Sequence, residues 1–407
     1  MNNYLNKKQL IILLLGFSSG LQLALTGGTL QAWLKDSKVD LSVIGYLSAV
    51  SVPYTYKFLW APALDTVQVS SLGIRRGWIL LTQFLLIASI VYLGSLNPES
   101  ELSLVATIAL AVAFFSATQD IAIDAFRREI LLDSELGQGA ATSQLGYRLG
   151  MILSSGIALI LADKFGWHVV YYSMAASLLV GVGATLISEE PARGKRVSPK
   201  LADFVLPFKD FFKRSFWPEI LLLILLYKIT DAFAMALTTP FLIELGFTKT
   251  EIGSVLKIIG VSATILGSLL AGWLMTKLSL RSALIYFGMA QLLANFAYFA
   301  LSLVGPSFEV FTISVIIENF GSGLGTAAFV AFLMTITSRE FSATQYSLYT
   351  SIAALSRLLV QIPSGDIAKS LGWSGYFLLS VALGIPAVLL VTVRFNRWKL
   401  SKDPVSL

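Results

Sequence analysis

The sequence predicts an all-α integral membrane protein with twelve transmembrane helices in two bundles of six, and three observations support this fold class. Of the 407 residues, 56% are hydrophobic and 13% are charged, roughly half the charged share of a soluble protein. The mean hydropathy is +0.75. The hydrophobic residues also form continuous runs of about 20 residues, the length that crosses a bilayer as a helix. Such a chain cannot cover itself with polar surface, so we expect the lipid bilayer to be its solvent.

Twelve apolar runs have the length and continuity of transmembrane helices. Because they are continuously apolar rather than alternating, they indicate helices and exclude an outer-membrane barrel. In chain order, the predicted spans cover residues 10–34, 41–63, 77–96, 102–125, 139–162, 167–187, 217–243, 250–275, 281–304, 309–335, 342–365 and 372–394.

The positions of the basic residues predict the orientation of the chain. If both termini lie in the cytoplasm, the cytoplasmic tails and loops hold 20 of the 30 Lys and Arg residues, and the opposite loops hold 5. Cytoplasmic loops of membrane proteins are enriched in these residues, so we expect both termini to be cytoplasmic. The formal net charge of +6 then reflects membrane orientation, and no nucleic-acid partner is expected.

Two residue types that carry much of enzyme and metal chemistry are almost absent. The chain has no cysteine, which excludes disulfides, thiolate metal ligands and cysteine nucleophiles, and its one histidine is His168. A histidine-based metal site or a Ser-His-Asp triad is therefore not expected. We predict that the protein is not an enzyme and uses neither a metal nor a cofactor.

The longest connection between predicted spans divides the chain into two halves. We expect an N-terminal bundle over residues 1–187, a cytoplasmic linker over 188–216, a C-terminal bundle over 217–394 and a cytoplasmic tail over 395–407. Within the linker, residues 200–216 have the apolar spacing of an amphipathic helix on the membrane surface. An ordinary solvated linker is the alternative.

The two halves also repeat weakly. Residues 23–26 (LALT) resemble 235–238 (MALT), and residues 162–167 (ADKFGW) resemble 368–373 (AKSLGW). Both pairs are separated by about half the chain. Two six-helix bundles related by a parallel repeat resemble the architecture of major-facilitator transporters.

Ionisable residues inside the predicted spans mark a candidate polar path. Such residues are costly in lipid and usually face a bundle interior or an aqueous cavity. Spans three, six, nine and twelve, which are peripheral in the major-facilitator arrangement, have none in their interiors. The five positive and four negative side chains favour a substrate with carboxylates or phosphates. They are Lys57, Asp120, Asp124, Arg148, Lys228, Asp231, Lys257, Glu318 and Arg357.

Some of these side chains are placed to pair with one another. Lys228 and Asp231 are three residues apart and share a helical face, and Lys257 and Glu318 lie at similar depth. Either pair therefore has a purely structural interpretation beside the functional one. Arg148 lies near the midplane without a sequence neighbour that neutralises it, and we expect it to contact substrate or to relay protons.

Two carboxylates share one face of the fourth span. Asp120 and Asp124 are one helical turn apart, and nearby carboxylates raise each other's proton affinity. One interpretation is proton binding and release during transport. The other is an inner gate in which a carboxylate pairs with Lys57, Arg75 or Arg76.

A set of segments across nearly the whole chain includes most of the intramembrane charges. They are Gly16–Gly20, Leu23–Thr26, Thr29–Trp33, Lys57–Pro62 with Asp65, Arg75–Trp78, Ser116–Ile121 with Asp124 and Ala125, Leu145–Met151, Tyr227 and Lys228, Asp231–Met235, Leu237–Thr239 and Phe341–Gln345. Taken together, these segments are specific, and they resemble the AmpG family of muropeptide permeases.

This resemblance implies a proton-driven importer in the bacterial inner membrane. Its implied substrates are anhydromuropeptides, which are anionic glycopeptides. We expect the transporter to be a monomer. The predicted substrate contacts are Gln22, Arg148, Lys228, Asp231, Lys257, Glu318 and Arg357. The predicted proton-coupling residues are Asp120, Asp124, Asp231 and Glu318. The predicted cytoplasmic gate consists of Lys57, Asp65, Arg75 and Arg76.

Two departures from the family pattern leave other substrates open. Some AmpG members have two further C-terminal spans. In addition, the major-facilitator loop signature after the second span is degenerate in this sequence, because Thr66 follows Asp65. A siderophore importer of related architecture is the main alternative. An enzyme for lipid-linked saccharides and a sensor derived from a permease are the alternatives from other classes.

Overall fold

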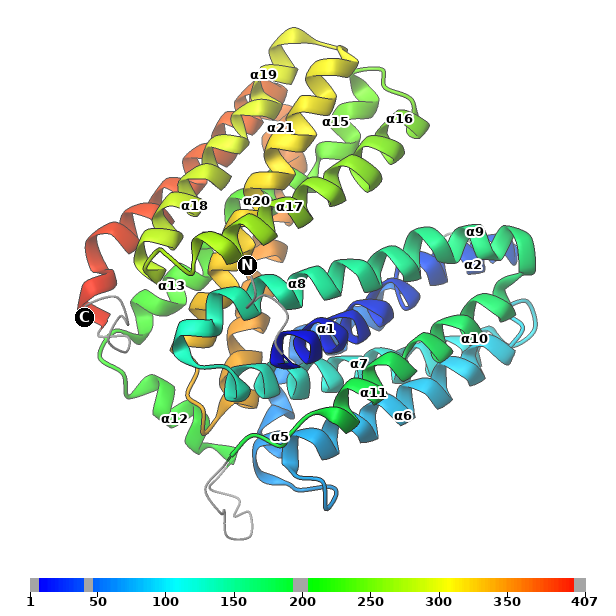
Figure 1. Cartoon of the computed structure of the whole chain (residues 1–407). Coiled ribbons are helices and arrows are strands. Elements are labelled where there is room, and N and C mark those ends of the chain that lie inside the picture. The colour runs from blue at the N-terminus through cyan, green and yellow to red at the C-terminus, as the bar shows by residue number, and fades with distance from the viewer. Residues whose placement is uncertain (1–6, 40–46, 193–203, 399–407) are drawn as a thin grey trace. The chain divides into compact units, whose positions relative to one another are not determined.

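The computed structural model describes residues 7–39, 47–192 and 204–398, and the chain within these ranges is helical without a β-strand (Figure 1). The all-α fold class predicted from the sequence is therefore confirmed. Three predicted features lie partly outside the described residues. They are the start of the second span (40–46), the linker (193–203) and the C-terminal tail (399–407).

Contacts between residues divide the chain into two compact units. Each unit contains a short segment from the other half of the sequence. Unit 1 comprises Met1–Leu132, Thr142–Asp210 and Thr337–Ser351, and unit 2 comprises Asp133–Ala141, Phe211–Ile336 and Ile352–Leu407.

The helices of the first half follow the predicted spans closely. Short turns of 3₁₀ or π helix join several of them. The elements are α1 (Lys7–Leu25), α2 (Gly28–Asp36), η1 (Ser48–Ser51), α4 (Val52–Tyr56), η2 (Lys57–Leu59), α5 (Ala61–Thr66), α6 (Ile74–Ser95), α7 (Leu102–Ile130), η3 (Asp133–Glu135), α8 (Leu136–Ile152), η4 (Leu153–Ile157), α9 (Ala158–Phe165), α10 (Trp167–Ser177), α11 (Leu179–Ile187) and α12 (Leu206–Phe212).

The helices of the second half are interrupted more often. The seventh span is split into three pieces, and the eighth contains a π-helical segment. The elements are α13 (Trp217–Tyr227), α14 (Ile229–Ala236), α15 (Thr238–Glu244), α16 (Lys249–Ser254), η6 (Val255–Gly260), α17 (Val261–Leu274), α18 (Leu280–Ala294), α19 (Phe296–Val304), α20 (Phe308–Ile336), α21 (Ser342–Arg394) and η7 (Phe395–Trp398).

Ten helical stretches in the described ranges are long and apolar enough to cross a membrane. One of them, Ser342–Trp398, covers two predicted spans. Its helix changes direction at Gly372, whose φ of 67° lies in the left-handed region that glycine tolerates. The predicted second span is present between Ser48 and Thr66 as short helical pieces, too short to count among the ten.

Two predicted helix boundaries are wrong by several residues. The third and fourth spans were expected at 77–96 and 102–125, whereas α6 begins at Ile74 and α7 continues to Ile130. The sequence places the arginines near these ends in solvent, but Arg75, Arg127 and Arg128 are buried and have partners inside the protein. Those partners stabilise the extra turns.

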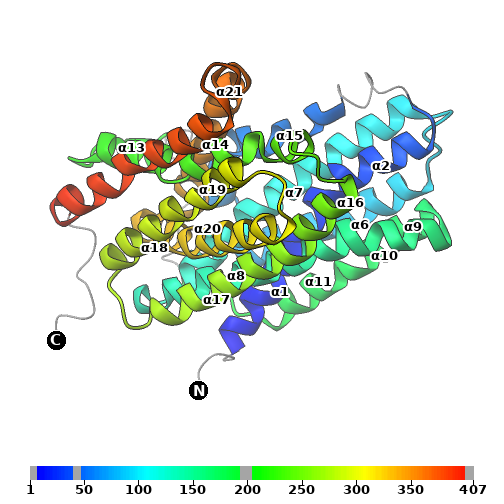
Figure 2. The ribbon, with the colours of Figure 1, turned by 90° about the horizontal axis from the view of Figure 1, so that it is seen from above.

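In unit 1, α6 packs against α7 and α10, and α1 packs against α7 and α11 (Figures 1 and 2). The contact between α1 and α8 depends on glycines from both helices. A Cβ atom on Gly20 would lie 2.0 Å from the Tyr147 carbonyl oxygen, and one on Gly146 would lie 2.1 Å from the Leu13 carbonyl oxygen. Glycine at these positions permits the close backbone approach that small residues give membrane helices.

In unit 2, α20 lies between α17 and α18 (Figure 2). Three glycines on α20 make room for these neighbours. A Cβ atom on Gly323 would lie 2.3 Å from the Thr264 carbonyl oxygen on α17. A Cβ atom on Gly325 would lie 1.8 Å from the Gln291 side chain on α18, and Gly321 packs against Ala294. These glycines therefore let two helices pack closely against α20.

The weak sequence repeat has a structural counterpart in each unit. Gly166 and Gly372 both have positive φ, and a tryptophan follows each. In unit 1, Trp167 stacks on Trp33 with centroids 6.4 Å apart, and Tyr171 lies 4.8 Å from Trp33. In unit 2, the corresponding rings Trp373 and Phe377 lie 5.1 and 4.8 Å from Phe241. The same turn therefore anchors the same kind of ring cluster in both halves.

Candidate functional site

Unit 1 contains a charged cluster on α7. Asp124 pairs with Arg127 at 2.9 Å and lies 3.9 Å from the Lys57 ammonium. One turn earlier, Asp120 accepts a hydrogen bond from the Ser19 hydroxyl on α1. The helical spacing therefore brings both carboxylates to one face, as predicted, but it gives them different partners. Asp124 is balanced by two cations, whereas Asp120 is bound by a neutral hydroxyl.

Arg127 connects this cluster to the segment at the start of α21. Its guanidinium donates to the Ser143 hydroxyl on α8 and to the Tyr346 hydroxyl at 2.9 Å. Tyr346 belongs to the part of α21 that packs in unit 1. Because Arg127 also pairs with Asp124, one guanidinium joins the Asp124 carboxylate to the Tyr346 hydroxyl.

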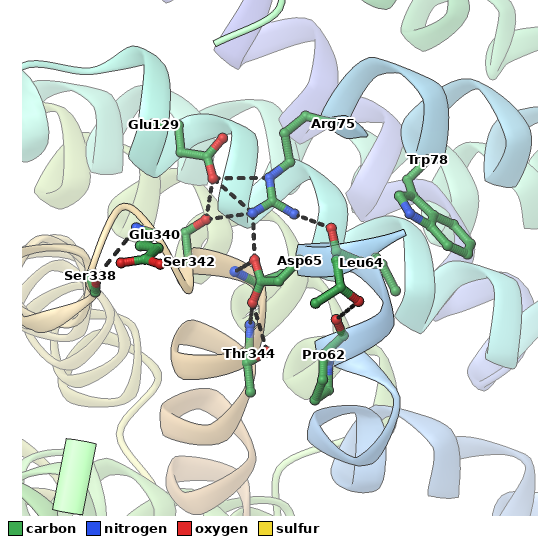
Figure 3. Close-up of polar contacts among 12 residues, drawn as sticks. Pro62, Leu64, Asp65, Arg75, Trp78, Glu129, Ser338, Glu340, Ser342 and Thr344 are labelled. Atoms are coloured by element: carbon green, nitrogen blue, oxygen red, sulfur yellow. Dashed lines mark hydrogen bonds and ion pairs between the residues drawn. The ribbon is translucent and has the colours of Figure 1, made fainter. Parts of the chain in front are cut away.

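A second buried arginine of unit 1 joins two acidic side chains (Figure 3). The Arg75 guanidinium donates from Nη2 to Asp65 Oδ1 at 2.6 Å and to Glu129 Oε1 at 2.7 Å. Its Nη1 donates to the Leu64 carbonyl oxygen at 2.7 Å. The Arg75 and Asp65 side chains are fully buried. Because the planar guanidinium has five donors in a rigid fork, one arginine serves both carboxylates.

The first turn of α21 completes this network (Figure 3). Asp65 accepts hydrogen bonds from the backbone N–H groups of Ala343 at 3.1 Å and Thr344 at 2.9 Å, and from the Thr344 hydroxyl at 2.7 Å. The Ser342 hydroxyl accepts from Arg75 at 2.8 Å and donates to Glu129. A carboxylate at a helix N-terminus satisfies free N–H groups and the helix dipole. The start of α21 is thereby fixed to α5, α6 and α7.

Gln345 extends the same segment to the helix α12 of the linker. Its Nε2 donates to Asp210 Oδ2 at 2.7 Å and to the Pro207 carbonyl oxygen at 3.2 Å. Its Oε1 accepts from the backbone N–H of Ser338 at 2.9 Å. Residues 342–345 thus each make specific contacts, all within unit 1.

Two of the four predicted gate residues, Lys57 and Arg76, lie outside this network. Lys57 faces Asp124, as described above. The Arg76 side chain donates to the carbonyl oxygens of Thr185 at 3.2 Å and Leu186 at 3.0 Å, at the end of α11. Its backbone N–H donates to Glu190 at 2.9 Å, which caps the N-terminus of α6. Arg76 therefore binds the end of the sixth span.

Unit 2 contains a separate polar cluster at the break between α13 and α14. Lys228 lies at this break, and its ammonium is 2.6 Å from Asp231 Oδ2. Lys228 also donates to the Thr326 hydroxyl at 3.1 Å, and the Ser322 hydroxyl donates to Asp231 at 2.7 Å. Lys228 further donates to Gln291 Oε1 at 3.4 Å. Discontinuous helices form solute sites in many transporters.

The remaining predicted substrate contacts differ in exposure. Gln22 is fully buried inside unit 1, and Glu318 is buried inside unit 2 with 2% of its surface exposed. Arg148 is half-buried, whereas Lys257 and Arg357 are exposed. Among the described residues, Lys257 forms no hydrogen bond or ion pair, so the structure does not contain the Lys257–Glu318 pair that their similar depth would permit.

Several residues of these clusters were missed by the sequence analysis. Glu129 directly follows Arg127 and Arg128, and this charged stretch was interpreted as a cytoplasmic loop. Arg127 was assigned to a loop for the same reason, and Gln291 lies in a span without charges. A signal existed for residues 341–345, because this segment is among those that resemble the AmpG family.

These features define a multi-pass membrane transporter. Residues 12–361 match the family model described as the Major Facilitator Superfamily, and the chain belongs to this superfamily. Two solved structures show the same fold. FucP in its outward conformation has a TM-score of 0.73 at 11% identity, covering 96% of this chain and 99% of FucP. The proton:xylose symporter XylE has a TM-score of 0.68 at 14% identity, covering 98% of this chain and 96% of XylE.

Three relatives are similar along nearly the whole chain. The protein of Escherichia coli strain K12 named anhydromuropeptide permease is 46% identical over 386 residues, which cover 94% of this chain and 79% of the relative. An uncharacterized protein of Haemophilus influenzae is 38% identical, covering 94% and 93%. The putative transporter AmpG 4 of Rickettsia felis is 33% identical, covering 93% and 94%.

These relatives confirm the predicted resemblance to the AmpG family. They also agree with the prediction that the chain is not an enzyme, because the named relatives are a permease and a transporter.

Proposed function

We propose that the protein imports anhydromuropeptides across the bacterial inner membrane in symport with protons. The observation that carries this proposal is the 46% identity to a protein named anhydromuropeptide permease over 94% of the chain. The intramembrane charges support an anionic glycopeptide as substrate, because arginine and lysine side chains match its carboxylates. We further propose that the transporter is a monomer with both termini in the cytoplasm.

The proposed substrate contacts of unit 2 centre on Lys228 and Asp231. Their ion pair of 2.6 Å lies at a helix break, and discontinuous helices form the solute sites of many transporters. The other proposed contacts are Gln22, Arg148, Lys257, Glu318 and Arg357. Arg148 is the proposed anion-binding residue of unit 1.

The proposed proton-coupling residues are carboxylates in contact with exchangeable partners. In unit 1, protonation of Asp124 would weaken its ion pairs with Arg127 on the same helix and with Lys57 on η2. Asp120 accepts a hydrogen bond from Ser19 on α1. In unit 2, the proposed carboxylates are Asp231 and Glu318. Proton binding at such groups supports coupling to conformational change by alternating access.

The proposed cytoplasmic gate centres on Asp65 and Arg75. These side chains fix residues 342–344 to the first-half helices, and those residues continue along α21 into unit 2. We propose that this network forms when the cytoplasmic side is closed and breaks when it opens. Lys57 and Arg76 are proposed to support the gate through Asp124 and the end of α11.

Uptake of a labelled anhydromuropeptide into right-side-out vesicles tests this function. An inward proton gradient is expected to drive accumulation, and a protonophore is expected to abolish it. Empty vesicles serve as the control, and a siderophore panel tests the alternative cargo. None of the relatives reported above is named as a siderophore carrier. Accumulation of a siderophore without accumulation of the muropeptide would overturn the proposal.

Point variants test the proposed roles in the same vesicles. Arg148→Ala is expected to abolish uptake while the protein still reaches the membrane, because a single midplane charge adds little to helix formation. An Arg148→Ala protein absent from the membrane would instead assign Arg148 a structural role. Among Asp120→Asn, Asp124→Asn, Asp231→Asn and Glu318→Gln, the variant of a proton carrier is expected to lose the pH dependence of uptake.

A further inference from the structure

The ninth predicted span has a buried polar face at the point where its helix is interrupted. α18 ends at Ala294 and α19 begins at Phe296, with Asn295 between them. Gln291, Asn295 and Tyr298 follow at intervals of four and three residues, which places them on one helical face. Gln291 is 2% exposed, and the other two are 0% exposed.

Two of these side chains lack the hydrogen bonds that burial demands. The side-chain amide nitrogen and oxygen of Asn295 have no hydrogen-bond partner among the described residues. The Tyr298 hydroxyl has none there either. Other buried tyrosines behave differently. Tyr171 donates to the Leu25 carbonyl oxygen, and Tyr376 donates to the Phe233 carbonyl oxygen. Buried polar groups in folded proteins are nearly always paired with protein or with ordered water.

A face of α20 lies opposite this interruption. Ser314 donates to the Ala297 carbonyl oxygen at 2.9 Å, and Gly321 packs against Ala294 and Gln291. Glu318 lies between Ser314 and Gly321 on the same helical face. Glu318 therefore belongs to the face of α20 that packs against the stretch from Ala294 to Ala297.

We propose that Asn295, Tyr298 and Glu318 line an internal water site within unit 2, where Glu318 takes up and releases the transported proton. The proton role rests on the proton symport proposed above, whereas the water site does not. In the proposed step, a protonated water gives its proton to the Glu318 carboxylate, which leaves a neutral water and a carboxylic acid. Release is the reverse transfer, so charge and atoms balance.

The other ionisable groups on the elements packed against α20 have different surroundings. Asp231 is paired with Lys228 at 2.6 Å. Lys257 on η6 is exposed, and α17 has no ionisable side chain. Arg281 on α18 donates to the Thr392 carbonyl oxygen, and Tyr286 is exposed. By contrast, three side chains of this region are uncharged hydrogen-bond donors, namely Asn295, Tyr298 and Asn319. Asn319 donates to Glu318 Oε2 at 2.8 Å.

The Ser322 hydroxyl links this site to the Lys228 cluster. Ser322 lies one helical turn after Glu318 on α20, and its hydroxyl donates to Asp231. A proton on Glu318 is therefore held one helical turn from the hydroxyl that donates to Asp231. This placement gives proton uptake a short route by which to affect the ion pair of Lys228 and Asp231.

Radiolytic hydroxyl-radical labelling of the full-length protein in nanodiscs tests the water site. A bound water next to Tyr298 is expected to make its ring several-fold more reactive than the rings of Tyr171 and Tyr376. These are matched controls, because all three side chains are 0% exposed and only the controls have a backbone partner. The Asn295→Leu variant is expected to lower Tyr298 labelling. Equal labelling of all three tyrosines would overturn the water site.

Vesicle uptake tests the proton role separately. In Asn295→Leu and Tyr298→Phe, gradient-driven accumulation is expected to fall several-fold relative to substrate counterflow, which needs no gradient. Tyr286→Phe, at an exposed position of α18, is the control. Unchanged pH dependence in Glu318→Gln would overturn the proton role. Wild-type uptake that does not depend on the proton gradient would overturn both the proposed symport and the proton role of Glu318. The labelling of Tyr298 would still test the water site in that case.

Discussion

At the scale of single residues, Arg75 is a fully buried side chain held by several partners. Its guanidinium makes bonds of 2.6 to 3.0 Å with Asp65, Glu129 and the Leu64 carbonyl oxygen in full burial. Breaking a buried ion pair from one side leaves an uncompensated charge, which costs far more than the intact pair contributes. The identity of this residue is therefore fixed by two carboxylates that cannot reach water.

Arg75→Met is expected to destabilise the protein by about 3–5 kcal/mol, because Asp65 and Glu129 lose their common cation. The measurement is the unfolding midpoint of the purified protein in detergent. Arg75→Lys keeps the positive charge but loses the forked donors of the guanidinium. Its stability is expected to lie between those of the wild type and Arg75→Met. An Arg75→Met protein as stable as the wild type would contradict this account of the network.

At the scale of helices, glycine faces determine which spans pack closely. Gly20 on α1 and Gly146 on α8 each lie against a backbone carbonyl of the other helix. A methyl group at either position would overlap that carbonyl, and a backbone atom cannot move aside as a flexible side chain can. The helix pair therefore tolerates no side chain at this contact.

Gly20→Ala is expected to cost roughly 1–3 kcal/mol of stability, because its Cβ would lie 2.0 Å from the Tyr147 carbonyl oxygen. Gly183→Ala on α11 is the matched control, since no atom lies within 4 Å of its added Cβ. That control is expected to be neutral or slightly stabilising through helix propensity. Thermal unfolding of both variants in the same detergent provides the measurement, and equal losses would contradict the packing argument.

At the scale of the whole molecule, the distribution of basic residues predicts the orientation of the transporter. The loops assigned to the cytoplasm hold 20 Lys and Arg residues, against 5 in the opposite loops. The chain has no cysteine, so single-cysteine variants report the location of one loop at a time.

Lys164→Cys and Lys369→Cys are expected to react with a membrane-impermeant maleimide added to intact cells, because both loops are predicted outside. Lys277→Cys is expected to react only after the membrane is opened. All three side chains are exposed, so access to their surface is not limiting. The reverse pattern would show that the termini lie on the outer side.

The sequence alone determined the fold class, because bilayer crossing requires long apolar helices that are visible as runs of residues. It also indicated the contact of Lys228 with Asp231 and the common face of Asp120 and Asp124, since both depend on spacing of three or four residues along the chain. Segment resemblance identified the family before any contact was known.

Only the tertiary structure showed which distant side chains share a site. Asp65 binds Thr344, which is 279 positions away in the chain, and Asp65 and Glu129 both bind Arg75. Residues this far apart show no helical periodicity in the sequence that would predict their contact. In the sequence, Asn295 is an ordinary polar residue. Only the structure shows that its side-chain amide is buried without a hydrogen-bond partner among the described residues. Spacing within a helix is fixed by local geometry, whereas contacts between helices depend on packing that no single segment specifies.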